Sequence, residues 1–357
     1  MSDTQYTELW SSLSEKSRHI ETGMDALTRK RTGSYYTDLK LTDVMMSELV
    51  EHLKVANPTK KLYEYRFLEP CVGAGNFVFS YIKAVRATGL DKETAMIMLD
   101  NIYVVDVNTD ALNGYRESLK KMAALFWGIE LQEDYFEQHL GTGLLVDVTA
   151  AELNYINISE VFSKEIVGAG FDIVATNPPY KNLKAERGHY SSDEEYDRDK
   201  DKYSAISKIV AKRFKYSTDG VLNLYKLLVE EIIDRYASET AFVSLLIPAS
   251  IMSDKTCMKL RTHMLKDNKM ISVKVIGEGS GFIDAQQALS AILLQKSHKT
   301  DKVAVVKDYC NNPNDIAEVA IKDILNENTG NAIVAVTSKE YRILRKLRQF
   351  PVVKELP

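Results

Sequence analysis

The sequence predicts a doubly wound α/β fold built on a mostly parallel sheet. Seven short stretches rich in apolar and β-branched residues recur along the chain, and segments with helical periodicity separate the first five of them. Such alternation is typical of βαβ units. The seven expected strands are Glu64–Glu69, Ile102–Asp106, Leu144–Val148, Phe171–Thr176, Phe242–Ile247, Ile271–Ile276 and Leu289–Gln295.

The segments between these strands complete the pattern. Helical periodicity is clear in Ala111–Leu125 and in Asn223–Tyr236, and a glycine-rich turn is expected to open a helix near Phe77–Ala87. Only a short glycine-rich segment separates the last two strands, which predicts that they pair antiparallel. The charged run Ser191–Lys202 is either a solvated loop or helix, or a substrate-contacting loop.

Composition is ordinary for a folded protein, at 45% hydrophobic and 27% charged residues in 357. The three cysteines, Cys71, Cys257 and Cys310, have neither metal-ligand spacing nor a disulfide framework. We therefore expect no metal and a reducing cytoplasm. The first ten residues lack the features of a signal peptide. The most apolar window, Ala241–Met252, is much shorter than the ~20 residues of a membrane span, so no membrane partner is expected.

The net charge is −4, from 46 basic and 50 acidic residues. Neutralising the phosphates of a nucleic acid usually requires a basic surface. The charge therefore argues against a free-standing nucleic-acid binder, although a local basic cleft is compatible with it.

The first motif is the glycine-rich segment Phe67–Phe77, in which a strand runs into a turn. Gly73 and Gly75 allow the backbone to approach a ligand closely. Glu69, which ends the strand just before Pro70, places a carboxylate where it can face a cationic ligand. The methionine end of S-adenosylmethionine carries both a sulfonium and an ammonium group. A purely structural glycine turn is the alternative.

Two further acids follow strands. Asp106 ends the second strand, where a carboxylate can accept hydrogen bonds from both hydroxyls of a ribose. Asp147 follows the third expected strand and can face the adenine ring of the cofactor. Either residue can instead be a helix cap or turn residue, since aspartate suits these positions equally well.

The fourth motif, Asn177-Pro178-Pro179-Tyr180 after a strand, is the most specific. Two prolines fix two φ angles and remove two N–H donors, which stiffens the turn. The side-chain oxygen of Asn177 and the carbonyl of Pro178 can then accept the two hydrogens of an exocyclic amino group. This favours the tetrahedral, nucleophilic form of its nitrogen. Tyr180 offers a ring on which the base can stack.

Together these motifs resemble those of the amino-group DNA methyltransferases with the gamma-type motif order, as in type II and IIG restriction-modification methylases. The resemblance covers roughly residues 31–357 and implies a seven-stranded class I, Rossmann-like fold that binds S-adenosylmethionine. The segment Gly33–Asp38 is similar to the amino-terminal cofactor motif of the family, whose tyrosine and threonine bracket the methionine moiety. Asp38 stands where proline is usual.

The resemblance assigns roles to the other motifs. Val148 stands where a larger apolar residue is usual, so the segment around Asp147 departs most from the pattern. The implied cofactor-binding residues are Tyr35, Tyr36, Thr37, Glu69, Pro70, Gly73, Gly75, Asp106 and Asp147, and the implied catalytic residues are Asn177, Pro178, Pro179 and Tyr180.

Three later segments also match. Asn223-Leu-Tyr225 resembles a tripeptide of the family at the start of a helix, and Leu246-Ile-Pro248 resembles the exit of the next strand. The family often places an aromatic residue before its last strand to stack on the second face of the target base, and Phe282 is the candidate. The alternative for Phe282 is an aromatic at the edge of the core.

The resemblance implies methyl transfer to N6 of an adenine that is flipped out of double-stranded DNA, as the modification component of a restriction-modification or related defence system. Asparagine rather than serine before Pro-Pro favours adenine over cytosine N4.

Three regions are expected. Residues 1–32 form a polar helical segment, residues 33–310 the catalytic domain, and residues 311–357 an extension towards a target-recognition domain that the chain lacks or that a separate specificity subunit supplies. Other functions remain open. A protein-glutamine or ribosomal-RNA methyltransferase also uses Asn-Pro-Pro-Tyr, and a non-catalytic subunit keeps the same fold. A nicotinamide oxidoreductase is disfavoured, because Val78 replaces the third glycine of its fingerprint.

Overall fold

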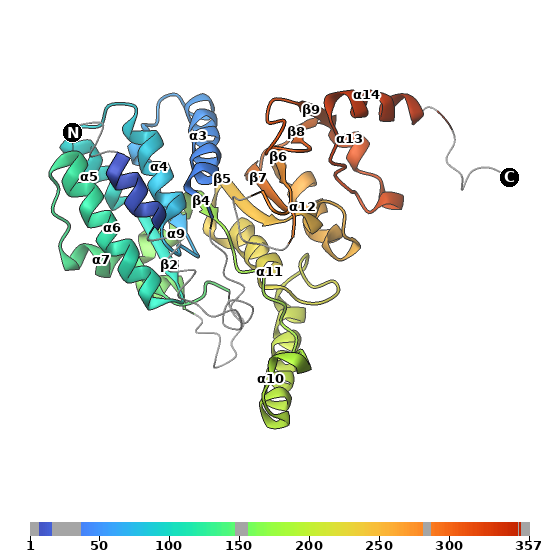
Figure 1. Ribbon diagram of the computed structural model, residues 1–357, viewed down its shortest axis with the longest axis horizontal. Coiled ribbons are helices and arrows are strands. Elements are labelled where there is room, and N and C mark those ends of the chain that lie inside the picture. The colour runs from blue at the N-terminus through green and yellow to red at the C-terminus, as the bar shows by residue number, and fades with distance from the viewer. Residues whose placement is uncertain (1–6, 16–36, 147–155, 281–286, 349, 351–357) are drawn as a thin grey trace.

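The computed structural model describes residues 7–15, 37–146, 156–280, 287–348 and 350 (Figure 1). Its centre is a nine-stranded sheet with the order β3-β2-β1-β4-β5-β7-β6-β8-β9. The strands are β1 Phe67–Glu69, β2 Ile102–Asp106, β3 Leu140–Thr142, β4 Phe171–Thr176, β5 Ala237–Pro248, β6 Lys269–Ile276, β7 Leu289–Gln295, β8 Lys302–Val306 and β9 Ile316–Ala320.

Helices cover both faces of this sheet. They are α3 Leu39–Ala56, α4 Asn76–Arg86, α5 Lys92–Asp100, α6 Thr109–Trp127, α7 Glu133–His139, α8 Ile158–Val161, α9 Lys164–Ala169, α10 Asp193–Arg213, α11 Leu224–Glu231, α12 Met258–Lys266, α13 Ile321–Ile324 and α14 Ser338–Leu347. Residues 7–15 form a further helix, which corresponds to part of the expected segment 1–32; its Leu9 and Leu13 are buried in the core beside α3 and α4.

The strand order confirms the doubly wound fold. Strands β3, β2, β1, β4 and β5 are parallel, and β7 lies antiparallel between β5 and β6, as the short glycine-rich connection predicted. From β1 the chain first winds outward to β2 and β3, and then returns to the other side through β4 and β5. In sheets of this kind, ligands bind beyond the carboxyl ends of the strands at the point where the winding reverses.

Alternation along the strands divides the interior into two cores. In β2, Val104 belongs to the core shared with α3 to α6, whereas Val105 belongs to the core shared with α10 to α12. The same alternation separates Ile173 from Val174 in β4. Successive side chains of a strand point to opposite faces, so a sheet buried on both faces consists of nearly continuous apolar strands.

Two expected strands are placed differently. The strand expected at Leu144–Val148 is wrong: the edge strand is β3, and it pairs with β2 through Leu140 to Thr142. The apolar run Leu144–Val146 is buried in the core and does not join this ladder, and residues 147 and 148 lie outside the described residues. The strand expected from Glu64 begins at Phe67, because Leu62–Glu64 forms a 3₁₀ turn.

Strands β8 and β9 extend the sheet beyond the seven expected strands. Both are short and lie at the far edge, where exposed and buried residues alternate. The expected end of the catalytic domain at residue 310 falls between these two paired strands.

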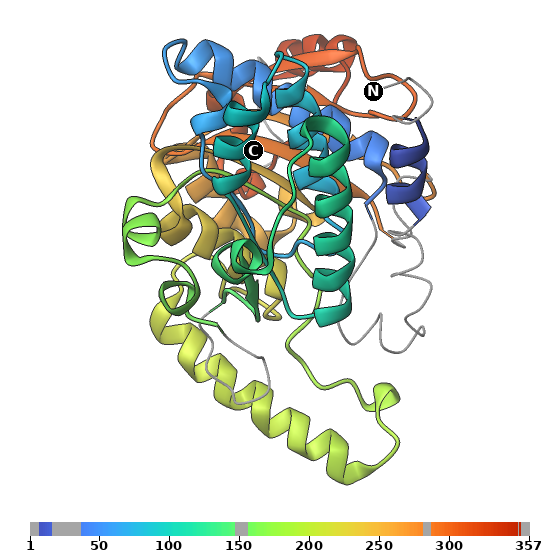
Figure 2. The same ribbon diagram turned by 90° about the vertical axis from the view of Figure 1, so that its left-hand side faces the viewer.

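The expected helices are present. The helix near Phe77–Ala87 is α4, the periodicity of Ala111–Leu125 belongs to α6, and Asn223–Tyr236 comprises α11 and the π-helical turn Ile232–Tyr236. The charged run Ser191–Lys202 lies mostly in α10, a 21-residue helix that projects from the body of the molecule (Figure 2). Only side chains in its second half are buried, namely Tyr203, Ile206 and Val210.

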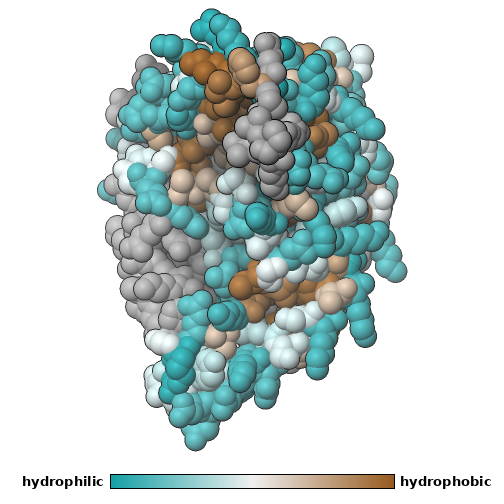
Figure 3. Space-filling model, turned by 90° about the vertical axis from the view of Figure 1, so that its right-hand side faces the viewer, coloured by the Kyte–Doolittle hydropathy of each residue, from teal (hydrophilic) through white to brown (hydrophobic). Residues whose placement is uncertain are grey.

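The carboxyl-terminal elements lie on one side of the molecule. Figure 3 shows apolar surface on this face. The large apolar side chains exposed in this part of the chain are Ile316, Val334, Ile343, Leu347 and Phe350. None of the helices within the described ranges has the length and apolar character needed to cross a membrane.

Candidate functional site

The predicted site residues that the structure describes gather at the carboxyl edge of the parallel strands. Glu69 ends β1, Asp106 ends β2 and Asn177 follows β4. Since β1 lies between β2 and β4, these three positions surround the point where the winding reverses. The parallel pairing of β1 with β2 places Asp106 beside the glycine turn. Sequence spacing and composition alone do not predict this proximity.

Asp106 holds the glycine turn directly. Its Oδ2 accepts a hydrogen bond from the backbone N–H of Gly73 at 2.7 Å, and its Oδ1 accepts one from Asn108 at 2.9 Å. Burial raises the pKa of Asp106, while these backbone donors oppose that rise. The helix cap considered for Asp106 is instead Asn108, whose side chain accepts hydrogen bonds from Asp110 and Ala111 at the start of α6.

The two glycines of this turn have different reasons to lack a side chain. At Gly75, φ is +91° and an added Cβ would lie 2.5 Å from the ring of Tyr115. At Gly73, φ is +50° and an added Cβ would meet nothing within 4 Å. Gly75 therefore allows the turn to pack against α6, whereas Gly73 leaves open space in front of the turn.

This difference predicts unequal costs of substitution. We expect Gly75→Ala to lower the free energy of unfolding by about 2–5 kcal/mol, because backbone strain and a steric clash add together. Gly73→Ala, which incurs only the strain, should cost about 1–2 kcal/mol. Urea unfolding of both variants measures these values. Equal losses would contradict the packing role assigned to Gly75.

Glu69 is a buried carboxyl group, with only 2% of its surface exposed. It accepts a hydrogen bond from the backbone N–H of Val78, but its Oε2 has no hydrogen-bond partner among the described residues. Burial, together with the nearby charge of Asp106, raises the pKa of Glu69 well above its usual value. A cationic group beside Oε2 would satisfy this orphaned atom, so the residues of the turn fit a ligand with a sulfonium and an ammonium group.

Asn177 is held at both ends of its amide group. Its Nδ2 donates a hydrogen bond to Oγ1 of Thr37 at 2.8 Å, and its Oδ1 accepts one from the hydroxyl of Tyr180 at 2.5 Å. The Tyr180 hydroxyl also lies 2.9 Å from the carbonyl oxygen of Leu246. Pro178 is buried and Pro179 half-buried, so the turn that carries Asn177 is packed as well as stiff.

A pocket of about 360 Å³ adjoins Tyr180. Three sequence motifs that are far apart in the chain line it together, through Tyr180, Tyr225 and Pro248. The ring of Tyr180 meets that of Tyr225 edge to face, with centroids 6.2 Å apart. Asn223 begins α11 as its N-cap, as the Asn-Leu-Tyr segment suggested. The volume lies within the range of small-molecule sites.

Several residues of this region belong to no sequence motif and were not predicted. Asn182 lines the pocket and pairs with Asn223, whose Nδ2 donates to Asn182 Oδ1 at 2.9 Å. Ser250, Asp254 and Gln287 also line it. Proximity in sequence to Asn-Pro-Pro-Tyr is a signal that identifies Asn182, but no sequence signal identifies the other three residues.

Four predicted residues lie outside the described residues. They are Tyr35, Tyr36, Asp147 and Phe282. The assignments of these residues to the cofactor and the target base remain predictions.

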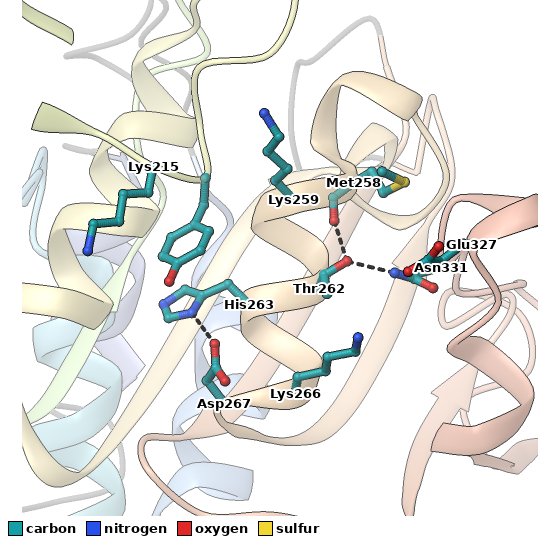
Figure 4. Close-up of a pocket in the computed structure, with 10 residues that line it drawn as sticks. Lys215, Met258, Lys259, Thr262, His263, Lys266, Asp267, Glu327 and Asn331 are labelled. Atoms are coloured by element: carbon teal, nitrogen blue, oxygen red, sulfur yellow. Dashed lines mark hydrogen bonds and ion pairs between the residues drawn. The ribbon is translucent and has the colours of Figure 1, made fainter. Parts of the chain in front are cut away.

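A larger cleft of about 580 Å³ lies beside α12 (Figure 4) and contains none of the predicted residues. His263 stands at its centre, stacked on Tyr216 and bonded to Asp234 at 2.9 Å and Asp267 at 2.7 Å. These hydrogen bonds outweigh the effect of burial and raise the pKa of His263. The lysines of the cleft are balanced by nearby carboxylates, so the cleft has no dominant charge. The lysines are Lys215, Lys259 and Lys266, and the carboxylates are Asp219, Asp234, Asp267 and Glu327.

A cluster of three or more His, Cys, Asp or Glu side chains suited to a metal ion does not occur in the described part of the chain.

The family model of the Eco57I restriction-modification methylases matches residues 100–282, more than half of the 357 residues. The chain belongs to this family. The match includes the second strand, the Asn-Pro-Pro-Tyr turn and the strand that ends at Pro248. No curated protein sequence matches the chain.

Solved structures of restriction-modification enzymes share the fold of this family member. The DrdV–DNA complex has a TM-score of 0.61 at 16% identity, over 84% of this chain and 30% of that chain. A nuclease-deletion mutant of the Type ISP enzyme LlaGI with a DNA substrate mimic has a TM-score of 0.57 at 14% identity, over 88% of this chain and 25% of that chain. The ATP-dependent Type ISP enzyme LlaBIII bound to DNA has a TM-score of 0.56 at 13% identity, over 79% of this chain and 20% of that chain. The match thus spans less than a third of each of these larger chains.

Proposed function

We propose that this chain transfers a methyl group from S-adenosylmethionine to N6 of an adenine flipped out of double-stranded DNA, as the modification component of a restriction-modification system. The observation that carries the proposal is the amide of Asn177, fixed at both ends beside a pocket that Tyr180 lines. Membership of the Eco57I family supports DNA as the substrate.

The glycine turn and its surroundings would hold the cofactor. Glu69 would face its cationic end, Gly73 leaves room for it, and Asp106 would bind the ribose. Thr37, Pro70 and Gly75 would form its walls, and Tyr35, Tyr36 and Asp147 belong to the same proposal. When bound, S-adenosylmethionine supplies a methyl group on a positively charged sulfur.

The target nitrogen is a weak nucleophile because its lone pair is delocalised into the ring. Asn177 Oδ1 has two lone pairs, so it can accept a hydrogen of the target amino group while it keeps the bond from Tyr180. The carbonyl of Pro178 would accept the second hydrogen. The nitrogen held in this way would take the methyl group, while the electron pair of the carbon–sulfur bond would go to sulfur. It would then lose one proton to solvent.

The pocket next to Tyr180 would receive the extruded base. Extrusion costs a few kcal/mol, and stacking on an aromatic ring offsets about 1–3 kcal/mol per base. Tyr180 would provide one such face and Phe282 the other. Asn182, Asn223 and Gln287 offer amide groups for the polar edge of the base.

Sequence recognition would come from a target-recognition domain or a separate specificity subunit. The net charge of −4 supports a recognition surface on another domain or subunit, because that surface would then make most of the phosphate contacts. The exposed apolar side chains Ile343 and Leu347 of α14 offer a surface for such a partner.

The test is the transfer of label from tritiated S-adenosylmethionine to unmethylated bacterial genomic DNA, followed by nucleoside analysis. Label in N6-methyladenosine is the expected result, with the chain alone or after a specificity subunit is added. Label in N4-methylcytosine would overturn the choice of base. Label only in protein or ribosomal RNA would overturn DNA as the substrate. Cofactor binding without any transfer would favour a non-catalytic subunit.

A further inference from the structure

Thr37 lies where three parts of the site meet. It directly precedes Asp38, which caps α3 by accepting a hydrogen bond from Lys40. The carbonyl oxygen of Thr37 accepts a hydrogen bond from Nδ2 of Asn76, the first residue of α4, at 2.5 Å. Its hydroxyl accepts the hydrogen bond from Asn177. Only 7% of the surface of Thr37 is exposed.

The position of this hydroxyl is set by helix packing. Helices α3 and α4 pack against each other. Asp43 of α3 accepts a hydrogen bond from Ser80 at 2.8 Å. Since α4 begins at the glycine turn, the place of Thr37 is tied to the segment proposed to bind the cofactor.

An asparagine amide can turn over and exchange its oxygen with its nitrogen. Only one orientation presents the oxygen of Asn177 to a target amino group. A partner that accepts from Nδ2 stabilises that orientation, and a bonded Nδ2–H makes the amide oxygen a better acceptor. The hydroxyl of Thr37 is placed to do both.

We propose that Thr37 is a positioning residue, whose hydroxyl orients the amide of Asn177 and links it to the cofactor turn. This inference rests on the proposed function. It differs from the role that the resemblance implies for Thr37, which is contact with the methionine moiety of the cofactor. A cofactor contact predicts weaker cofactor binding when the hydroxyl is removed, whereas a positioning role predicts slower turnover with the cofactor affinity retained.

The experiment compares Thr37→Val, which removes the hydroxyl and keeps the shape, with Thr37→Ser, which keeps the hydroxyl. Thr37→Val should lower kcat about tenfold, the effect of one lost hydrogen bond, with little change in KM for DNA or in the cofactor Kd from calorimetry. Thr37→Ser should keep most of the wild-type kcat. Thr42→Val is the matched control, because it removes a buried hydroxyl of α3 that lies beside Ser80 and not beside Asn177.

A raised cofactor Kd with unchanged kcat in Thr37→Val would overturn the proposal, and so would an equal loss of kcat in Thr42→Val. A second measurement does not depend on activity. Thr37→Val and Asn177→Ala break the same hydrogen bond, so their decreases in Tm should be less than additive in the double variant. The decreases for Thr42→Val and Asn177→Ala should add.

These readouts separate this proposal from the proposed function. If the wild-type chain transfers no methyl group to DNA even with a specificity subunit, the proposed function fails. The Thr37–Asn177 link is then judged by the Tm values, and additive decreases overturn it.

Discussion

Replacing Asn177 with alanine should lower the rate of methyl transfer roughly 10²- to 10³-fold, the usual effect of removing one preorganised polar group from a reaction centre. The side-chain oxygen of Asn177 is the acceptor proposed to favour the nucleophilic form of the target nitrogen. The amide bonds to Thr37 and Tyr180, whereas Glu69 and Asp106 lie on other strands. Cofactor affinity should therefore change little. Single-turnover transfer and calorimetry measure the two quantities.

Asn182→Ala is the comparison for this variant. It also removes an amide, only five residues further along, but Asn182 bonds to Asn223 and not to the Asn177 turn. We expect its effect to appear mainly in KM for DNA. A rate for Asn177→Ala within about threefold of wild type would exclude Asn177 from the chemical step, since that change corresponds to less than 1 kcal/mol.

Replacing Glu69 with glutamine should raise the cofactor Kd roughly 10- to 150-fold, because hydrogen bonds to charged groups are worth about 1.5–3 kcal/mol. The charge of Glu69 is also expected to make binding depend on pH. Burial raises the pKa of the free carboxyl group, so it holds a proton below that pKa. A bound cation favours the ionised form, so binding releases a proton, and affinity should increase as the pH rises towards the pKa of the free protein.

Calorimetry in buffers with different ionisation enthalpies measures the protons released on binding. Wild type should release more protons than Glu69→Gln at the lower pH values, and the two should converge at high pH. Glu51→Gln, a change at an exposed residue of α3, should behave as wild type. Unchanged proton release in Glu69→Gln would show that Glu69 does not face the cation.

The central sheet was predictable because its strands are apolar and end in recognisable residues. Strands β2, β4 and β7 were predicted with the bounds that the structure has. The edges were not. Strand β3 has only three residues and contains Gly141, so a nearby buried apolar run gave a stronger strand signal than the strand itself. Periodicity does not distinguish an apolar run that pairs from one that only fills a core.

The site was predictable one residue at a time, but its contacts were not. Asn177 and Glu69 stand out in the sequence because Asn-Pro-Pro-Tyr and a carboxylate before a glycine turn are unusual. The bond between Thr37 and Asn177 spans 140 positions, and it depends on how α3 packs against α4. No local pattern contains that information, just as none brings Ser250 and Gln287 to the pocket.

The projecting helix α10 lies within the segment 181–224, whose two ends are hydrogen-bonded to each other. Leu183 donates to the carbonyl of Leu222 at 2.8 Å, and Leu224 donates to that of Lys181 at 2.9 Å. Asn182 and Asn223 are paired between them. These hydrogen bonds hold the walls of the pocket independently of the outer half of α10. A change in the length or charge of that outer half is therefore expected to leave the geometry around Tyr180 unaltered.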